Sequence, residues 1–369
     1  MSDFVGQPQI LKAVNIAMIE QLILERGPLS KPELVRLTGL SLPTVSKLAD
    51  DLEASGNIRP VGLSGKGAGR KAMLYEINKD SGCLLVLYYH GGAYAGRVTD
   101  ITGKTLYKDT FPLDPATAET AFSTTLSAVD ALTKKAPNPV SAIGIGVPGV
   151  VQPDGRLLGI PKIPSWDGFN LSGALASHYP TDTCIENDVK LSAVGYYLTH
   201  LSERYENIVY IYAGDGMGAG IIINGKLYRG ANNFSGELGF MAPLTGKPPE
   251  RDYTGIGGYL ESELISSVQC GNKVFSDAAF QRDVLANILG AAAANHVAVL
   301  NPDVLVFGGE AFDEALIEQI HAQMAFYTPG DSMPLIQYDD NANTGIKGLV
   351  LTCRGYITTR LQLVQNGGV

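Results

Sequence analysis

The feature that most constrains this fold is an internal repeat of a strand, a glycine turn and a second strand. The first copy runs from an apolar strand at 84–89 to a Thr-Gly-Lys turn at 102–104, and the second runs from a strand at 209–213 to an Asn-Gly-Lys turn at 224–226. Self-similarity of this kind marks repeated structural units. We therefore expect two similar α/β lobes that face each other across a cleft, a common place for a small ligand.

The first eighty residues have a different pattern, which begins with a helix. Ile10, Val14, Met18 and Leu22 recur at four-residue spacing. This spacing predicts one apolar face of a helix that ends near Gly27.

Two shorter helices follow, separated by a turn. Ser30 and Glu33 form a capping box that begins the second helix, which ends at Gly39. Ser41 caps the third helix, which ends at Gly56. The side chains expected to be buried on this third helix are Val45, Leu48 and Leu52.

A helix, a short glycine turn and a second helix form the helix-turn-helix arrangement, in which the start of the second helix enters the major groove of DNA. Four side chains are expected to face outward at that start: Pro43, Thr44, Ser46 and Lys47. They are candidate DNA contacts. The alternative interpretation of three helices alone is a small packing or dimerisation bundle.

Two strands after the third helix, 58–63 and 72–77, flank a glycine-rich basic loop and predict a wing. Glycine lets such a loop follow a groove, where basic side chains reach phosphates or a narrow minor groove. The candidate contacts here are Arg59, Arg70 and Lys71. The alternative for the loop alone is a solvated linker.

The net charge is −9, which argues against a protein that coats nucleic acid over its whole surface. The charge is uneven, however, because residues 1–75 hold nine lysines and arginines against seven acidic residues. A local DNA-binding surface is therefore compatible with the acidic total.

The cysteines indicate a reducing compartment. Cys83, Cys184, Cys270 and Cys353 are widely spaced and form no Cys-x-x-Cys pair, so we expect buried thiols. The chain has no signal-peptide pattern at its start and no run of 18 apolar residues. We expect a cytoplasmic protein with no membrane association.

Five motifs in the body, taken in order, resemble those of the ROK family of sugar kinases and sugar-responsive repressors. They lie at 144–149, 186–188, 214–220, 227–239 and 301–309. The resemblance covers nearly the whole chain, because the family's repressor branch, which includes xylose and N-acetylglucosamine repressors, also begins with a winged helix-turn-helix. It implies a body with the two-lobed actin-like, ribonuclease H-like fold of the sugar kinases.

These patterns predict the domain boundaries. Residues 1–79 form the winged helix-turn-helix domain. Near residue 80 the sequence pattern changes to apolar strands separated by glycine turns. The first α/β lobe spans 80–200 and is completed by 345–369, and the second lobe spans 201–344.

The resemblance implies degenerate phosphate motifs. Kinases need a base, backbone amides around the phosphates and Mg²⁺. Tyr88 and Ala93 replace the Asp and Thr of the family's first phosphate motif, and Asp215 replaces a Thr in the second. A carboxylate there repels a nucleotide by roughly 1–4 kcal/mol. ATP binding is not expected, and Asp188, which matches the family's catalytic base, is interpreted as vestigial.

The sugar-binding side is better preserved. The residues that match the family's sugar contacts are Gly149, Asn187, Asp188, Glu237 and Glu261. Carboxylates suit sugars because each can accept several hydroxyl hydrogen bonds. Lys162 and Phe240 replace an Asn and a His of the family pattern, which would shift the choice of ligand.

The family's zinc site is expected to be missing. Its His and three Cys correspond to Phe240, Asp252, Thr254 and Tyr259, and none of these four has a thiolate or an imidazole. No zinc and no other cofactor is therefore expected.

Together these features predict a homodimeric or homotetrameric repressor that binds operator DNA and a sugar or sugar-phosphate effector. One alternative is an active ATP-dependent sugar kinase with a DNA-binding head. Another is a repressor whose signal is a protein of the sugar phosphotransferase system.

Overall fold

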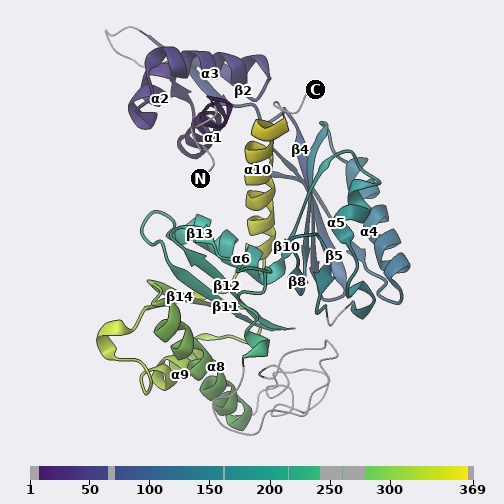
Figure 1. The fold of residues 1–369 in the computed structure, drawn as a ribbon, viewed down its shortest axis with the longest axis vertical. Coiled ribbons are helices and arrows are strands. Elements are labelled where there is room, and N and C mark those ends of the chain that lie inside the picture. The colour runs from purple at the N-terminus through teal and green to yellow at the C-terminus, as the bar shows by residue number, and fades with distance from the viewer. Residues whose placement is uncertain are drawn as a thin grey trace, which may run out of the picture.

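The computed structural model describes residues 8–64, 71–160, 163–214, 216–241, 260 and 279–364. Figure 1 shows a helical head at one end of the molecule and a body with two sheet-containing lobes. The C-terminal helix α10 (Thr344–Val364) starts beside the second lobe and runs up toward the head.

The head contains three helices and a small antiparallel sheet. Its elements are α1 (Pro8–Arg26), β1 (Leu29–Ser30), α2 (Lys31–Thr38), α3 (Leu42–Ala54), β2 (Ile58–Leu63) and β3 (Met73–Ile77). Ser30 and Glu33 form the predicted capping box at α2, and Ser41 caps α3. Both predicted helix starts are confirmed. Caps form at these positions because the first turn of a helix leaves backbone N–H groups unpaired, and each cap side chain accepts a hydrogen bond from one of them.

The packed face of α1 differs from the prediction. Val14 is 54% exposed, whereas Ile19 and Ile23 are buried in the core of the head. The predicted spacing was therefore wrong at Val14, whereas Leu22 is partly buried and packs against the core of the head. Helix α1 has apolar residues on adjacent faces, and packing in the head buries Ile19 and Ile23 most deeply.

The two lobes of the body have the same topology. The first sheet has the order β10-β7-β4-β5-β6 and the second has the order β13-β12-β11-β14-β15. In each, three antiparallel strands come first; the fourth strand then pairs in parallel with the first, and the fifth pairs in parallel with the fourth. This repeated order confirms the predicted internal repeat and the actin-like architecture.

The strands of the first sheet are β4 (Cys83–His90), β5 (Ala93–Asp100), β6 (Thr105–Pro112), β7 (Val140–Val147) and β10 (Asp182–Asn187). Those of the second are β11 (Ile208–Ala213), β12 (Met217–Ile223), β13 (Lys226–Leu227), β14 (Val304–Gly308) and β15 (Leu335–Asp339). The carboxyl ends of β7 and β10 therefore lie side by side at one edge of the first sheet.

Alternating residues of β4 divide the core of the first lobe. Leu85 packs in a cluster with residues of α4 (Ala118–Thr133) and α5 (Leu171–Ala176). Leu84, on the opposite face of the strand, packs in a cluster with residues of α10. Both faces of the sheet are covered, which explains why β4 is apolar at nearly every position.

Helix α6 (Asp188–Tyr196) belongs to the cores of both lobes. Leu191 packs with the first sheet and α10, whereas Val189 and Ala193 pack with strands of the second sheet. A π-helical turn, Tyr197–Leu201, continues α6. Since α6 starts directly after β10, its first residue lies where the two lobes meet.

Helices α8 (Ala279–Leu300) and α9 (Glu314–Met324) pack together on the second lobe. The stretch Arg282–Leu300 is long and apolar enough to pass for a membrane span, with a mean hydropathy of 1.4. However, 44% of that stretch is buried inside the protein, as in the core helix of a globular domain.

Short elements complete the fold. They are the strands β8 (Val150–Val151) and β9 (Leu157–Leu158) and the 3-10 turns Pro164–Trp166, Leu238–Phe240 and Gly330–Ser332. The cysteines Cys83, Cys184 and Cys353 are buried and form no disulfide. Cys270 lies outside the described residues.

Candidate functional site

The carboxyl ends of β7 and β10 bring three of the predicted sugar contacts together. Asn187 caps α6 by accepting a hydrogen bond from the backbone N–H of Lys190 at 2.9 Å. Its Nδ2 also donates to the carbonyl oxygen of Gly149 at 3.0 Å. Gly149, Asn187 and Asp188 therefore form one edge of a site between the lobes, which we call the interlobe site together with Glu237.

Gly149 is required by the backbone at this edge. Its φ is +84°, and a Cβ there would lie 2.7 Å from the carbonyl oxygen of Gly159 and 2.8 Å from that of Leu158. Both neighbours are backbone atoms, so a side chain would push the turn away from Asn187. The Pro-Gly motif thus sets the position of the first loop of the site.

Asp188 has an unusual environment for a carboxyl group. Burial raises its pKa to about 7, and repulsion by Glu237 acts in the same direction. The backbone N–H of Val189 and the charge of Lys190 oppose the increase. Near neutral pH, Asp188 can therefore both accept and donate hydrogen bonds, a property that suits recognition of a hydroxyl group.

Two contacts of buried charged side chains beneath this site were not predicted. Glu186 is 5% exposed and accepts hydrogen bonds from Arg229, at 2.9 Å from Nε and 2.8 Å from Nη2. Lys190 is 1% exposed and its Nζ donates to the carbonyl oxygen of Asn233. Each contact joins the first lobe or α6 to the segment that follows β13.

A sequence signal for Lys190 existed. It is the one charged residue in the otherwise apolar or small stretch 189–196, and a charge on such a helix is buried only when it has partners. Burial lowers the pKa of Lys190, whereas the carboxylates of Glu237 and Glu186 raise it. Buried charges of this kind hold the segment that carries Glu237 close to Asp188.

The region that would hold nucleotide phosphates in a kinase contains a tyrosine. The Tyr88 hydroxyl donates to the carbonyl oxygen of Asp188 at 3.3 Å. A Cβ on Gly146 would lie 2.8 Å from the Tyr88 ring, and one on Gly345 would lie 2.3 Å from its hydroxyl. The ring therefore fills the space between β7, α6 and the start of α10.

A carboxylate from the second lobe lies near the second phosphate motif. Glu310 accepts a hydrogen bond from the Tyr212 hydroxyl at 2.8 Å and lies 3.4 Å from His90 Nε2. A Cβ on Gly214 would be 2.1 Å from Glu310 Oε2. Glu310 was not predicted, although it directly follows the Gly308-Gly309 pair of the fifth motif.

The predicted DNA contacts of α3 lie at its start. Pro43 and Lys47 are exposed, and Thr44 and Ser46 are half-buried. The opposite face of this helix is packed in the head, as predicted: its buried residues are Val45, Leu48, Ala49 and Leu52. The first turn of α3 is therefore presented to solvent on a rigid support.

The acidic second half of α3 is partly neutralised by the other helices. Lys12 of α1 lies 2.8 Å from Asp51, and Lys31, the first residue of α2, lies 2.5 Å from Asp50. These pairs reduce the repulsion that the two aspartates would exert on a phosphate backbone.

The predicted contacts of the wing are only partly described. Lys71 is exposed and lies two residues before the start of β3. Arg59 instead pairs with Glu76 at 2.8 Å and with Asp80 at 3.1 Å, so its guanidinium has partners within the head. Arg70 lies outside the described residues.

Other predicted residues also lie outside the described part of the chain: Glu261, Lys162, Asp215, Asp252, Thr254 and Tyr259. Phe240 is described, and its ring contacts that of Phe234 with 5.1 Å between centroids. Within the described ranges, no group of three or more His, Cys, Asp or Glu side chains could hold a metal ion.

The chain is similar to known proteins in sequence and in fold. Residues 91–273 match the model of the ROK family. The chain is 27% identical over 240 residues to the xylose repressor of Bacillus subtilis, a match that covers 64% of this chain and 62% of that repressor. It thus spans less than two thirds of that relative.

Two further matches cover the head as well as the body. The N-acetylglucosamine repressor of Escherichia coli O157:H7 is 24% identical over 398 residues, which cover 96% of this chain and 95% of the relative. The solved structure of a ROK family transcriptional regulator, described as a homolog of the E. coli MLC protein, superposes with a TM-score of 0.77 at 19% identity. That match covers 96% of this chain and 100% of the other, and it shows a shared fold.

Proposed function

Because the chain carries a ROK-family domain, we propose that it is a transcriptional repressor that binds operator DNA through its head and senses a sugar in its interlobe site. The observation that carries the proposal is the joining, in one chain, of an exposed helix-turn-helix to a two-lobed body that keeps Asn187 and Asp188. Two relatives that are named as a xylose repressor and an N-acetylglucosamine repressor support it. Such a protein acts in the cytoplasm, where operator DNA is found.

The proposed domains are those expected from the sequence, with 1–79 as the DNA-binding domain. The first lobe spans 80–200 with 345–369, and the second lobe spans 201–344. The proposed DNA contacts are Pro43, Thr44, Ser46, Lys47 and Lys71, with Arg70 in the wing and Arg59 in a supporting position. Assembly as a homodimer or homotetramer would pair two heads at half-sites about one helical turn apart.

Lys47→Glu tests the DNA-binding surface. We expect the variant to lose at least about tenfold in affinity, about 1.4 kcal/mol, because it replaces a positive charge by a negative one where the start of α3 would face the phosphates. Binding is measured by fluorescence anisotropy, at several salt concentrations, on a duplex that the wild-type protein selects from a random library.

Lys79→Glu is the matched control, because Lys79 is an exposed lysine in the connection between the head and the body. It should change the affinity by less than about twofold. Equal losses in the two variants, or no loss in Lys47→Glu, would remove the start of α3 from the DNA interface.

The proposed effector contacts are Gly149, Asn187, Asp188 and Glu237, with Glu261 as a further proposed contact. A sugar or sugar derivative fits because these groups combine hydrogen-bond donors and acceptors of the kind that hydroxyl groups use. The ligand would change DNA binding by as much as it prefers one arrangement of the lobes. A protein of the sugar phosphotransferase system is the alternative signal.

An active sugar kinase remains the second candidate function, and Asp188 is the observation that favours it. Tyr88 fills space beside Asp188, and Glu310 adds negative charge where phosphates would lie. We therefore propose that the protein is not an enzyme and needs no cofactor.

MgATP provides a direct test between these two functions. We expect no change in the melting temperature when MgATP is added at a few millimolar, whereas a ligand present at about 100 times its Kd would stabilise the native state by about 2.7 kcal/mol. Addition of the effector sugar should raise the melting temperature in the same assay and serves as the positive control. A shift with MgATP, together with transfer of phosphate to a sugar, would establish the kinase instead.

A further inference from the structure

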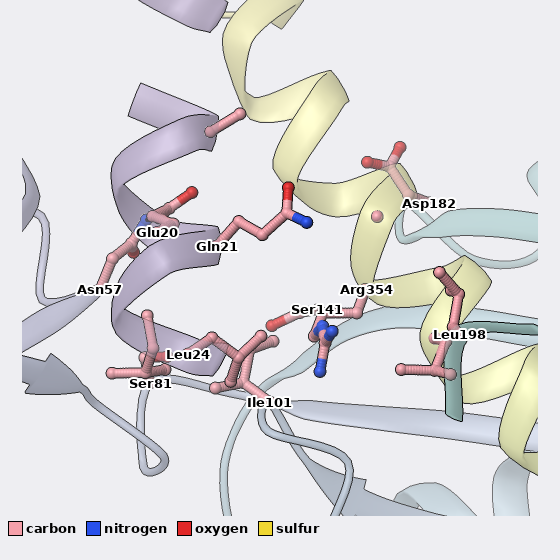
Figure 2. A pocket seen from close by; sticks show the side chains of 14 residues that line it. Glu20, Gln21, Leu24, Asn57, Ser81, Ile101, Ser141, Asp182, Leu198 and Arg354 are labelled. Atoms are coloured by element: carbon pink, nitrogen blue, oxygen red, sulfur yellow. The ribbon is translucent and has the colours of Figure 1, made fainter. Parts of the chain in front are cut away.

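A cavity of about 550 Å³ lies between the head and the body, away from the interlobe site (Figure 2). The head contributes residues of α1 and β3 to its wall. The body contributes Leu351, Arg354 and Gly355 from the middle of α10, with further residues from the amino-terminal ends of β7 and β10. Its volume is within the range of small-molecule sites in proteins, about 300–1,000 Å³.

The cavity and the interlobe site lie at opposite ends of the same strand. Asp182, the first residue of β10, lines the cavity, whereas Asn187, the last, belongs to the interlobe site. Five steps of about 3.3 Å separate them by about 17 Å. Ser141 lines the cavity near the start of β7, whereas Gly149 lies in the turn that follows the other end of that strand. A molecule in the cavity therefore leaves the interlobe site open to its own ligand.

The polar lining comes from both sides of the cavity. Figure 2 shows Gln21 of α1 and Arg354 of α10 extending into the space between the two helices. Glu20 of α1 accepts a hydrogen bond from Asn57 at 2.9 Å, and burial raises the pKa of Glu20. Arg354 is half-buried; burial lowers its pKa, and the charge of Glu25 opposes this decrease.

The charges and the apolar lining restrict the class of ligand. Two carboxylates, Glu20 and Asp182, face a single guanidinium, so an anion would meet net repulsion. Neutral hydroxyl groups can donate to the carboxylates and accept from Arg354. Leu24 and Ile101 supply an aliphatic surface for the C–H groups of such a molecule.

We propose that this cavity is a second effector site, which binds a neutral polyhydroxylated molecule of monosaccharide size and biases the orientation of the head. A ligand there contacts head and body together, so it favours the arrangement in which both walls fit it. Helix α10 connects the two sites, since Gly345 at its start lies against Tyr88 and Arg354 lines the cavity. The regulatory consequence rests on the proposed DNA binding, whereas occupancy of the cavity does not.

The test uses isothermal titration calorimetry on the full chain with D-xylose, N-acetyl-D-glucosamine and D-glucose as probes. The interlobe site is first disabled by Asp188→Ala, so that remaining heat reports the cavity. We expect at least one of the three sugars to bind the Asp188→Ala protein with one site per chain. D-Glucose 6-phosphate should bind at least tenfold more weakly than the sugar that binds.

Two substitutions then fill the cavity from opposite walls. Gln21 lies on an exposed surface of α1 and Leu198 is 47% exposed, so tryptophan at either position can extend into the cavity with little cost to folding. Gln21→Trp and Leu198→Trp, each in the Asp188→Ala protein, should weaken sugar binding at least tenfold. Val299→Trp, at an 80% exposed position on α8, is the matched control and should leave binding unchanged.

The outcomes separate this proposal from the interlobe site. If wild-type protein binds one sugar per chain and Asp188→Ala binds none of the three, the cavity site is refuted and the interlobe site stands. If Asp188→Ala binds as well as wild type and both tryptophan variants abolish binding, the cavity stands and the interlobe site fails. If sugar binding survives both tryptophan substitutions, the cavity proposal is overturned. It is also overturned if none of the three sugars binds to any of these proteins.

Discussion

Gly348→Ala is expected to lower the free energy of unfolding by about 1–3 kcal/mol, the range found when a closely packed contact is overfilled. A Cβ on Gly348 would lie 1.8 Å from the carbonyl oxygen of Leu191 in α6. The fit is reciprocal, because a Cβ on Gly195 of α6 would lie 2.2 Å from the carbonyl oxygen of Thr344. Backbone atoms cannot rotate away as a side chain can, so α6 and α10 would have to separate.

The same helix offers a matched control. Gly355 also lies in α10, and a Cβ there would meet no atom within 4 Å. Gly355→Ala should therefore raise the free energy of unfolding by about 0.5–1 kcal/mol, since alanine favours a helix over glycine. Urea unfolding followed by circular dichroism measures both changes. Equal effects of the two substitutions would mean that the close crossing of α6 and α10 does not exist in solution.

Asp188→Asn is expected to abolish the effect of the effector sugar on DNA binding while leaving DNA binding itself within about twofold of wild type. Asparagine keeps the size of the side chain and the acceptor for the N–H of Val189, but it removes the carboxylate. The measurement is fluorescence anisotropy of the selected duplex with and without the sugar that raises the wild-type melting temperature. A normal response in Asp188→Asn would place the sensor elsewhere.

The same substitution has an expected effect on stability that depends on pH. The pKa of Asp188 is about 7 in the folded protein, above its usual 3.8, so the folded state favours the protonated form. This contribution to stability is present below about pH 4 and is lost as the pH rises through about 7. Asp188→Asn should therefore be more stable than wild type at about pH 8. The gain in the free energy of unfolding is at most a few kcal/mol, because a pKa change of one corresponds to about 1.4 kcal/mol.

Urea unfolding at about pH 4 and about pH 8 measures this dependence. The difference in stability between Asp188→Asn and wild type should be small at the lower pH and largest at the higher pH. Asp331→Asn, at an exposed aspartate in the loop after α9, is the control and should show no such change between the two pH values. A constant difference at both pH values would show that burial does not control the ionisation of Asp188.

Features that depend on neighbouring residues were predictable from the sequence. The Ser30–Glu33 capping box and the Ser41 cap fixed the starts of α2 and α3, because a cap forms within one helical turn. The repeated strand-turn-strand pattern likewise predicted two similar lobes, since strand alternation and glycine turns are local properties. The motif around Asn187 correctly placed a polar group at the end of a strand and the start of a helix.

Features that join distant parts of the chain were decided only by the tertiary structure. Tyr88 contacts the backbone of Asp188 across 100 residues, and the side chains of Glu186 and Arg229 pair across 43. The packed face of α1 and the cavity beside Arg354 depend in the same way on elements that meet only in the folded protein. Hydrophobic periodicity and capping describe one element at a time, whereas these contacts depend on the relative placement of several elements, which is set by the packing of the whole chain.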